Sequence, residues 1–293
     1  MVLSPEVLVW VEASVGAGAS VLTVDPLPPS STEKHVVLLG TSGGSVRVVT
    51  RRYHDLDRLS TDFAYDPSNE ATALALLGPT DVPAPRLLAA DLPGAVCGFP
   101  LLLESWVPGA PGWSPSDLDS YLRVAAEVLV RIHAVPLSEQ LGVMAYRPYQ
   151  DHLSGALPGG AATGALWERV LQAIARPAPA GAQTFIHRDY HPGNALWDGQ
   201  SVTVVDWSTA AVGPPGIDLA RMRQNLAGRH GGVAADRFTQ LYVAAGGDAQ
   251  ARNPYWDLLD AAEFVDEAEL DAPGEGELAR FEDYVRGVLA ELG

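Results

Sequence analysis

The sequence predicts an α+β fold, in which a small lobe built on an antiparallel sheet is followed by a larger, mainly helical lobe. Short alternating runs that are typical of strands come first along the chain, and amphipathic helical patterns dominate after residue 116. Runs of strands followed by runs of helices are typical of α+β architectures. Between them, residues 107–112 are rich in proline and glycine, so we expect the first lobe at 1–107 and the second at 108–293.

The overall composition is that of a globular protein. Of 293 residues, 47% are hydrophobic and 19% are charged, which excludes wholesale disorder. The single cysteine, Cys97, excludes an intrachain disulfide framework and a cysteine-rich zinc site. No run resembles a signal peptide or approaches the ~18 apolar residues of a membrane span, so we expect a cytoplasmic protein with no membrane partner. The net charge of −17 would repel nucleic acid and attract a cationic small molecule.

The first lobe is predicted to contain two helices and five strands. Ser4 can cap a helix over residues 4–15. A glycine-rich turn at 40–44 separates the second and third strands of an antiparallel meander. A second helix begins at about Ser68 and ends at Gly78. The five strands are expected within residues 21–27, 35–39, 45–53, 82–91 and 99–107.

The second lobe is predicted to be mainly helical. Ser116 can cap a helix whose apolar residues recur at helical spacing on one face. Residues 148–162 are rich in glycine, alanine and proline and predict a loop. Further helices are expected over 164–176 and 217–292, with short strands at 185–186 and 202–205.

The most informative stretch is the octet H-R-D-Y-H-P-G-N at residues 187–194, followed by an apolar run and then Asp206. This order is specific, whereas a lone H-x-D is common. Phosphoryl transfer from a nucleotide needs a carboxylate that orients the acceptor hydroxyl and takes its proton, and it needs oxygen ligands for Mg²⁺. Asp189 could instead be a helix cap or a turn residue, but its register with Asn194 and Asp206 favours the catalytic interpretation.

These motifs resemble those of the aminoglycoside phosphotransferase and choline kinase-like family, which has a bilobal protein-kinase-like fold. The resemblance covers nearly the whole chain and includes the phrase V-V-D-W-S-T-A-A-V-G-P-P-G-I-D-L-A. It implies that Asp189 is the catalytic base and that Asn194 and Asp206 are Mg²⁺ ligands. It also implies that ATP or GTP is the phosphate donor, and that His187 and Asp218 give structural support to the catalytic loop.

The resemblance also assigns nucleotide-binding residues to the first lobe. The family grips the α- and β-phosphates with a Lys or Arg of the third strand, paired with a helix Glu, and Arg51 and Glu70 match these positions. Strand alternation puts Arg51 and Arg52 on opposite faces, so Arg51 is preferred unless the strand bulges, in which case Arg52 replaces it. The segment L-L-L-E-S-W-V-P-G resembles the hinge between lobes, where adenine would bond backbone groups of Glu104, Ser105 and Trp106.

The loop that should cover the phosphates departs from the family pattern. It is expected between the first two strands, where this chain has P-P-S-S-T-E at residues 28–33 and no glycine. Backbone approaches phosphate most easily at glycine. The hydroxyls of Ser30, Ser31 and Thr32 are therefore the expected substitutes, and the departure bears on nucleotide affinity and on the choice between ATP and GTP.

An acidic stretch near the C-terminus is the candidate acceptor site. Residues 254–283 contain 11 acidic residues and one basic residue, Arg280. Four carboxylates recur at spacings of three or four and would share a helix face with Trp256 and Phe264 nearby: Asp257, Asp260, Glu263 and Glu267. This face could receive an amine-bearing acceptor through Asp257 and Asp260, or it could be a solvated surface that binds nothing.

We therefore predict a small-molecule kinase that transfers the γ-phosphate of ATP or GTP to an acceptor hydroxyl. An aminoglycoside, another amino sugar, a choline-like molecule, a macrolide and a different metabolite all stay open as acceptors. The alternative is a non-catalytic nucleotide-binding pseudokinase or regulatory module of the same fold. The glycine-poor loop favours this alternative, and the intact Asp189, Asn194 and Asp206 oppose it. The sequence predicts no oligomeric state.

Overall fold

The structure is a computed structural model that describes residues 3–137, 142–149, 164–263 and 276–292. The chain divides into two units, and the segment that carries Asp206 belongs with the first. The first unit comprises Met1–Pro108, Gln140–Val143 and Thr203–Ala210, and the second comprises Gly109–Glu139, Met144–Val202 and Ala211–Gly293.

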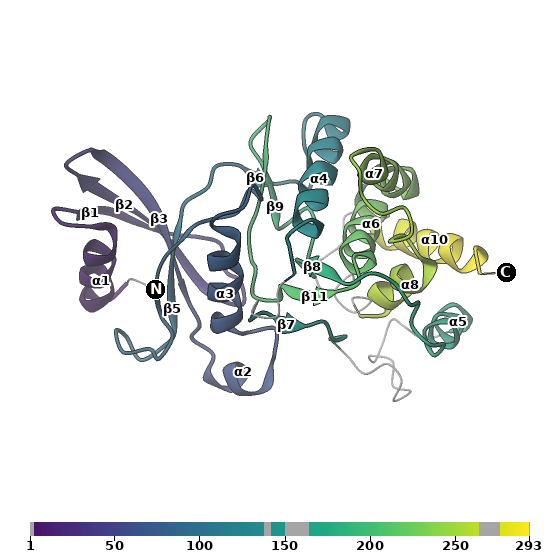
Figure 1. Ribbon diagram of the computed structural model, residues 1–293, viewed down its shortest axis with the longest axis horizontal. Coiled ribbons are helices and arrows are strands. Elements are labelled where there is room, and N and C mark those ends of the chain that lie inside the picture. Colours follow the sequence, from purple (N-terminus) through teal and green to yellow (C-terminus); the bar gives the residue numbers. More distant parts are fainter. Residues whose placement is uncertain (1–2, 138–141, 150–163, 264–275, 293) are drawn as a thin grey trace. The chain divides into compact units, whose positions relative to one another are not determined.

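The first unit is built on a five-stranded sheet in the order β1-β2-β3-β5-β4 (Figure 1). The first three strands form an antiparallel meander, and β5 pairs antiparallel with both β3 and β4. The prediction of an antiparallel sheet in this part of the chain is confirmed. The strands are β1 (Ser20–Pro26), β2 (Glu33–Thr41), β3 (Gly44–Arg52), β4 (Leu87–Asp91) and β5 (Leu101–Ser105).

The two faces of this sheet have different coverings. On one face, Val37, Leu39 and Val48 pack in a cluster with residues of α1 (Pro5–Val15). On the other face, Tyr53 and Leu102 pack with Ala71 of α3 (Pro67–Leu77). Because successive side chains of a strand point to opposite faces, the polar residues Lys34, Arg51 and Glu104 leave the sheet on the side of α3.

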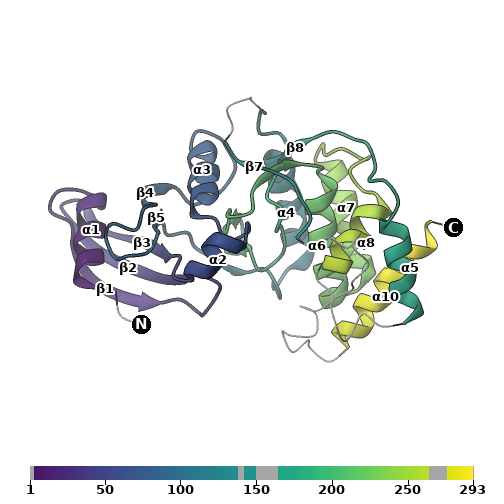
Figure 2. The ribbon, with the colours of Figure 1, turned by 90° about the horizontal axis from the view of Figure 1, so that it is seen from below.

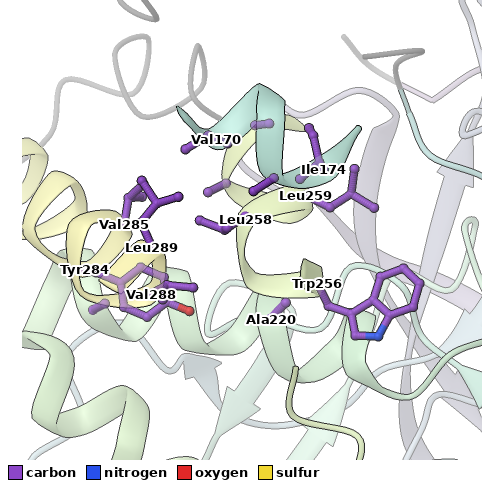
Figure 3. Packing of buried hydrophobic residues seen from close by; sticks show 14 of the residues in the cluster. Val170, Ile174, Ala220, Trp256, Leu258, Leu259, Tyr284, Val285, Val288 and Leu289 are labelled. Carbon is purple, nitrogen blue, oxygen red and sulfur yellow. The ribbon is translucent and has the colours of Figure 1, made fainter. Parts of the chain in front are cut away.

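The second unit contains most of the helices (Figures 1 and 2), and a cluster of buried apolar residues lies among them. Figure 3 shows how Leu258 and Leu259 pack among apolar side chains of two other helices, such as Val170 and Val288. Two small sheets have the strand orders β10-β9-β6 and β7-β11-β8. The helices are α4 (Leu118–His133), α5 (Ala165–Ile174), α6 (Gly216–His230), α7 (Gly232–Ala244), α8 (Pro254–Glu263) and α10 (Glu277–Ala290). The strands of these sheets are β6 (Ala110–Pro111), β7 (Met144–Ala145), β8 (Thr184–Ile186), β9 (Ala195–Trp197), β10 (Val202–Val204) and β11 (Ala211–Gly213), of which Thr203 and Val204 fall within the first unit.

Several helix ends differ from those predicted. Asp117, not Ser116, caps α4, because its carboxylate accepts a hydrogen bond from the Ser120 amide. Ser4 stands at the N-cap position of α1, but its side chain makes no capping hydrogen bond. The long helical pattern after residue 217 is interrupted at Gly231, which has φ = 88°, a conformation that costs glycine little.

Two further differences concern loops. A short helix that was not predicted, α2 (Leu56–Thr61), follows β3 and is capped by the Asp55 carboxylate. The expected loop at 148–162 lies largely outside the described residues. Within the described part of the chain, no helix is long and apolar enough to cross a membrane.

Candidate active site

The loop that follows β8 carries the octet motif, and the buried carboxylate of Asp218 stabilises it through hydrogen bonds to its backbone. Arg188 has φ = 72°, which is unfavourable for a residue with a side chain. The Asp218 carboxylate, on the first turn of α6, accepts hydrogen bonds from the backbone amides of His187 (2.9 Å) and Arg188 (2.6 Å). His187 Nδ1 in turn accepts from the Asp189 amide at 3.2 Å. These contacts are what loop-supporting roles for His187 and Asp218 require.

The Asp189 carboxylate is held at both oxygens. Arg221 Nε donates to Oδ1 at 2.9 Å, and Asn194 Nδ2 donates to Oδ2 at 3.0 Å. Asn194 Nδ2 also donates to the Asp189 carbonyl at 3.0 Å, which orients the amide so that its oxygen faces away from Asp189. The Asp189 side chain is 27% exposed, so an acceptor can reach it.

The charge of Asp189 follows from its neighbours. Burial is the largest single influence and raises the pKa of this carboxyl, but His191, Arg221 and His187 together outweigh it, and the net result is a pKa well below the usual value. Asp189 is therefore ionised at neutral pH and can accept a hydrogen bond from a hydroxyl group.

His191 lies against Asp189 and is oriented by a backbone hydrogen bond. The Gly193 amide donates to His191 Nδ1 at 3.0 Å, and the other ring nitrogen faces Asp189. Nε2 lies 3.4 Å from Asp189 Oδ2. The ring stacks near Trp113, with centroids 5.5 Å apart, and a Cβ at Gly193 would come within 2.6 Å of the ring. A side chain at Gly193 would therefore displace the His191 ring.

In the first unit, Arg51 is buried among three carboxylates. Its NH1 lies 2.8 Å from Asp206 Oδ1 and 3.0 Å from Glu70 Oε2, and its Nε lies 3.5 Å from Glu104 Oε1. The ion pair with Glu70 that the resemblance implies is therefore present. Arg52, on the opposite face of β3, pairs with Glu33, so the strand does not bulge in a way that exchanges the two arginines.

Two of the three carboxylates are part of the first unit's core. Glu70 accepts from the Tyr53 hydroxyl and from the Trp207 amide, the latter at 3.1 Å. Glu104 is buried beside Arg51: burial first, and then the charge of Glu70, raise its pKa to about 7, although Arg51 and Lys34 oppose the shift. The Glu104 side chain thus faces Arg51, a role that the hinge assignment did not foresee.

Asp206 is a partly exposed carboxylate that accepts hydrogen bonds from three neighbours. It adopts φ = 68°, and its carboxylate accepts from Arg51, from Lys34 Nζ at 3.3 Å and from Ser208 Oγ at 3.3 Å. Its side chain is 25% exposed. Carboxylate and amide oxygens are the hard ligands that Mg²⁺ prefers, so Asp206 in the first unit and Asn194 in the second fit this ion in chemistry.

The remaining predicted nucleotide-binding residues have varied surroundings. In the phosphate-covering loop, Ser30 and Ser31 are exposed, whereas Thr32 is buried, and Ser30 Oγ donates to the Thr32 carbonyl at 2.8 Å. At the hinge, the amides of Ser105 and Trp106 donate to the carbonyls of Arg86 and Arg47 at 2.9 and 3.3 Å. Adenine would therefore use backbone groups of the hinge other than these two amides.

The predicted acidic face on α8 is not a wet surface. Asp257 is 2% exposed and pairs with Arg223 Nε at 3.1 Å, while the Tyr284 hydroxyl donates to it at 2.8 Å. Asp257, Asp260 and Glu263 are all buried, so the alternative of a solvated face is wrong for these three residues, whereas the acceptor contact stays a prediction. Glu267 and Phe264 lie outside the described residues.

Asp260 differs from Asp257, because no arginine neutralises it as completely. It is 3% exposed, and its Oδ2 has no hydrogen-bond partner among the described residues. Burial raises the pKa of Asp260 well above its usual value, Arg221 lowers it, and Glu263 and Asp189 raise it further. These interactions place Asp260 within electrostatic reach of the Asp189 and Arg221 pair.

Sequence reasoning missed two of the cations in these groups. Arg221 lies three residues after Asp218, so one helix turn brings both to the catalytic loop, a spacing that could have identified it. Lys34 could have been identified from composition, because it is the single lysine in a chain with 18 arginines.

Solved structures of phosphotransferases have this fold over nearly their whole length. Macrolide 2'-phosphotransferase MphH from Brachybacterium faecium is 20% identical with a TM-score of 0.59, and the match covers 96% of this chain and 97% of that one. A thermostable mutant of aminoglycoside phosphotransferase APH(4)-Ia, in ternary complex with AMP-PNP and hygromycin B, is 15% identical with a TM-score of 0.65 and 98% coverage of each chain. The GDP and kanamycin complex of APH(2")-IIia is 17% identical with a TM-score of 0.60 and coverage of 93% and 94%. These identities show the fold, which is the predicted kinase-like one.

The family model for the phosphotransferase enzyme family matches residues 26–255. The chain therefore belongs to the phosphotransferase enzyme family, and the prediction of a phosphotransferase is confirmed. A comparison with curated proteins finds no match.

Proposed function

We propose that this protein is a magnesium-dependent kinase that transfers the γ-phosphate of ATP or GTP to a hydroxyl group of a small acceptor. The observation that carries the proposal is the partly exposed Asp189 side chain, which Arg221 and Asn194 hold at both oxygens. A fixed carboxylate of this kind is what an acceptor hydroxyl needs for alignment.

The role of Asp189 is to orient the hydroxyl and receive its proton. Each carboxylate oxygen has two acceptor positions, so the bonds from Arg221 and Asn194 leave room for the acceptor. Because the pKa of Asp189 is low, proton transfer follows the formation of the new O–P bond, and the larger contribution of Asp189 is alignment.

The nucleotide phosphates are assigned to the first unit. Arg51 would bind the α- and β-phosphates, with Glu70 holding its guanidinium, and Asp206 and Asn194 would hold Mg²⁺. When bound, Mg²⁺ neutralises charge on the phosphates. Ser30, Ser31 and Thr32 stay candidates for phosphate contact, and the backbone from Glu104 to Trp106 for adenine contact.

The lobe boundaries and the cellular location are also part of the proposal. We propose residues 1–107 as the nucleotide lobe and 108–293 as the lobe with the catalytic loop and acceptor site. A cytoplasmic location stays part of the proposal.

We propose an acceptor that bears an amine. The net charge of −17 supports it, as do the aminoglycosides bound by two of the similar structures. Asp260 is the better candidate contact, since Asp257 is already neutralised by Arg223 and Arg252. Macrolides should also be tested as acceptors, because one of the similar structures is a macrolide phosphotransferase.

A pseudokinase is the second candidate, and two observations favour it. The loop at 28–33 has no glycine, and Arg51 is already surrounded by three carboxylates. A coupled ADP- or GDP-release assay separates the two functions, with ATP and GTP, with and without Mg²⁺, against kanamycin, hygromycin B, a macrolide and choline. Acceptor-dependent release that disappears in Asp189→Asn supports a kinase, whereas nucleotide binding without release for any acceptor supports the pseudokinase.

A further inference from the structure

The single lysine of the chain stands at a distinctive place. Among 19 basic residues, 18 are arginines, and the one lysine is Lys34, the second residue of β2. It directly follows the glycine-free loop at 28–33 that is expected to cover the phosphates. A compact ammonium group with rotatable donors therefore lies at the end of the loop whose backbone is least suited to phosphate.

The sheet directs Lys34 to the same ligand region as Arg51. The two residues are cross-strand partners in the antiparallel pair of β2 and β3, so their side chains leave the sheet on one face. Like charges that lie directly opposite one another destabilise a sheet unless an anion compensates them. Asp206 is that anion, because it contacts Arg51 NH1 at 2.8 Å through Oδ1 and Lys34 Nζ at 3.3 Å through Oδ2.

The two cations differ in their burial and in the number of carboxylates that they contact. The Arg51 side chain is 4% exposed and lies among Glu70, Glu104 and Asp206. The Lys34 side chain is 18% exposed, and its ion pair with Asp206 is longer. Of the two, Lys34 is the cation that a ligand from solvent can reach and that can change partners without opening the core.

The cluster has fewer cations than carboxylates. Lys34 and Arg51 face the carboxylates of Glu70, Glu104 and Asp206, so the cluster as it stands carries no excess positive charge. A nucleoside triphosphate adds several negative charges. Removing Lys34 would leave Arg51 alone, balanced by acids, to meet them.

We infer that Lys34 is a second phosphate-binding cation, which acts beside Arg51 and replaces the contacts that a glycine-rich loop would provide. Its ammonium group exchanges Asp206 for a phosphate oxygen of the bound nucleotide. This inference deepens the proposed function and rests on it, since it assigns a residue to the same nucleotide site.

Labelling of the unmodified protein tests the inference directly. An acyl-phosphate derivative of ATP acylates amines that lie beside the phosphates, and Lys34 supplies the only side-chain ammonium group in the chain. Peptide mass spectrometry should find the acyl group on Lys34, and excess ATP should suppress it. Acetyl phosphate, which lacks the nucleoside, is the control for simple reactivity. Lys34 labelling that ATP does not suppress, or no labelling of Lys34, overturns the inference.

Nucleotide affinity provides the second measurement. Lys34→Met should weaken ATP binding about 10- to 100-fold in calorimetry, as expected for a lost charged hydrogen bond, and should leave adenosine binding unchanged. Lys34→Arg should recover most of the affinity. The matched control is Arg58→Met, because Arg58 also pairs with a carboxylate in the first unit, that of Asp62, but outside this cluster. Arg58→Met should leave both affinities unchanged.

The outcomes separate the two proposals. If wild type binds ATP and Lys34→Met binds it equally well, the role of Lys34 is wrong and the proposed function stands. If wild type binds neither ATP nor GTP, both are wrong. If Lys34→Met fails to fold, as judged by its denaturation curve, the labelling result and the Lys34→Arg affinity decide, since both need only folded protein.

Discussion

The two groups of residues assigned to the reaction are held by different kinds of interaction. In the first unit, Arg51 and Lys34 lie among three carboxylates, and the group is organised by charge. In the second unit, Asp189 faces the arginine Arg221, and directional hydrogen bonds from Arg221 and Asn194 fix its carboxylate while the buried Asp218 fixes its loop. A group organised by charge changes partners when an ion or a phosphate arrives, whereas a group organised by hydrogen bonds is already in its working arrangement. Changes in the first should therefore alter nucleotide affinity, and changes in the second should alter turnover.

The largest effect is expected at Asp189. Asp189→Asn keeps the shape of the side chain but removes the charge that accepts the hydroxyl proton. We expect kcat to fall by a factor on the order of 10²–10⁴, with nucleotide affinity largely intact. Steady-state kinetics with an acceptor identified by the panel, together with ATP calorimetry, measures both. Retention of more than about a tenth of the wild-type kcat would show that Asp189 is not the base.

The metal ligands should rank by charge. Asp206→Ala should abolish Mg²⁺-dependent nucleotide binding more severely than Asn194→Ala, because a carboxylate offers the ion a full charge and an amide only a dipole. Calorimetry of ATP binding with and without Mg²⁺ compares the two variants. Equal stimulation by Mg²⁺ in wild type and Asp206→Ala would exclude the metal role of Asp206.

The third prediction concerns Arg221, which we assign as a positioning residue for Asp189. Removing its charge in Arg221→Gln raises the pKa of Asp189, so the essential ionised form is lost at a higher pH than in wild type. We expect the acidic limb of the kcat/KM profile to move to higher pH, with activity several-fold lower at the acidic end and less affected above neutrality. Arg221→Lys should restore part of the shift. A uniform loss at every pH would instead indicate a purely structural role.

The smallest effect is expected on stability, from Glu104. Its pKa is raised to about 7 in the folded protein, above the value of an unfolded chain, so its contribution to stability is present at low pH and is lost as pH rises through about 7. Wild type should therefore lose roughly 1–3 kcal/mol of unfolding free energy relative to Glu104→Gln between pH 5.5 and 8. Urea denaturation of both proteins at the two pH values measures the difference. Parallel pH dependence would mean that Glu104 is ionised throughout.

The comparison also explains what could be predicted from the sequence. Asp189 and Asn194 are five residues apart, so their contact is contained in one local motif. The ion pair of Arg51 with Glu70 of α3 could be predicted from strand alternation together with the family resemblance. The contact of Lys34 with Asp206 spans 172 residues, and no periodic pattern encodes it.

The acidic helix shows the limit of periodicity in another way. Spacing correctly predicts that Asp257 and Asp260 lie on one helix. It cannot tell which neighbours cover that helix. Arg223 from α6 and Tyr284 from α10 neutralise and bury Asp257, so a face that is acidic in sequence is internal in the structure.

The measurement that tests the account most directly is a paired determination of nucleotide Kd and kcat in Asp189→Asn and Arg51→Met, with the same acceptor. The account predicts a separation: Asp189→Asn loses turnover and keeps its nucleotide Kd, whereas Arg51→Met loses nucleotide affinity first and recovers part of its turnover at saturating ATP. If both variants lose affinity and turnover in the same proportion, the division of work between the two groups is contradicted.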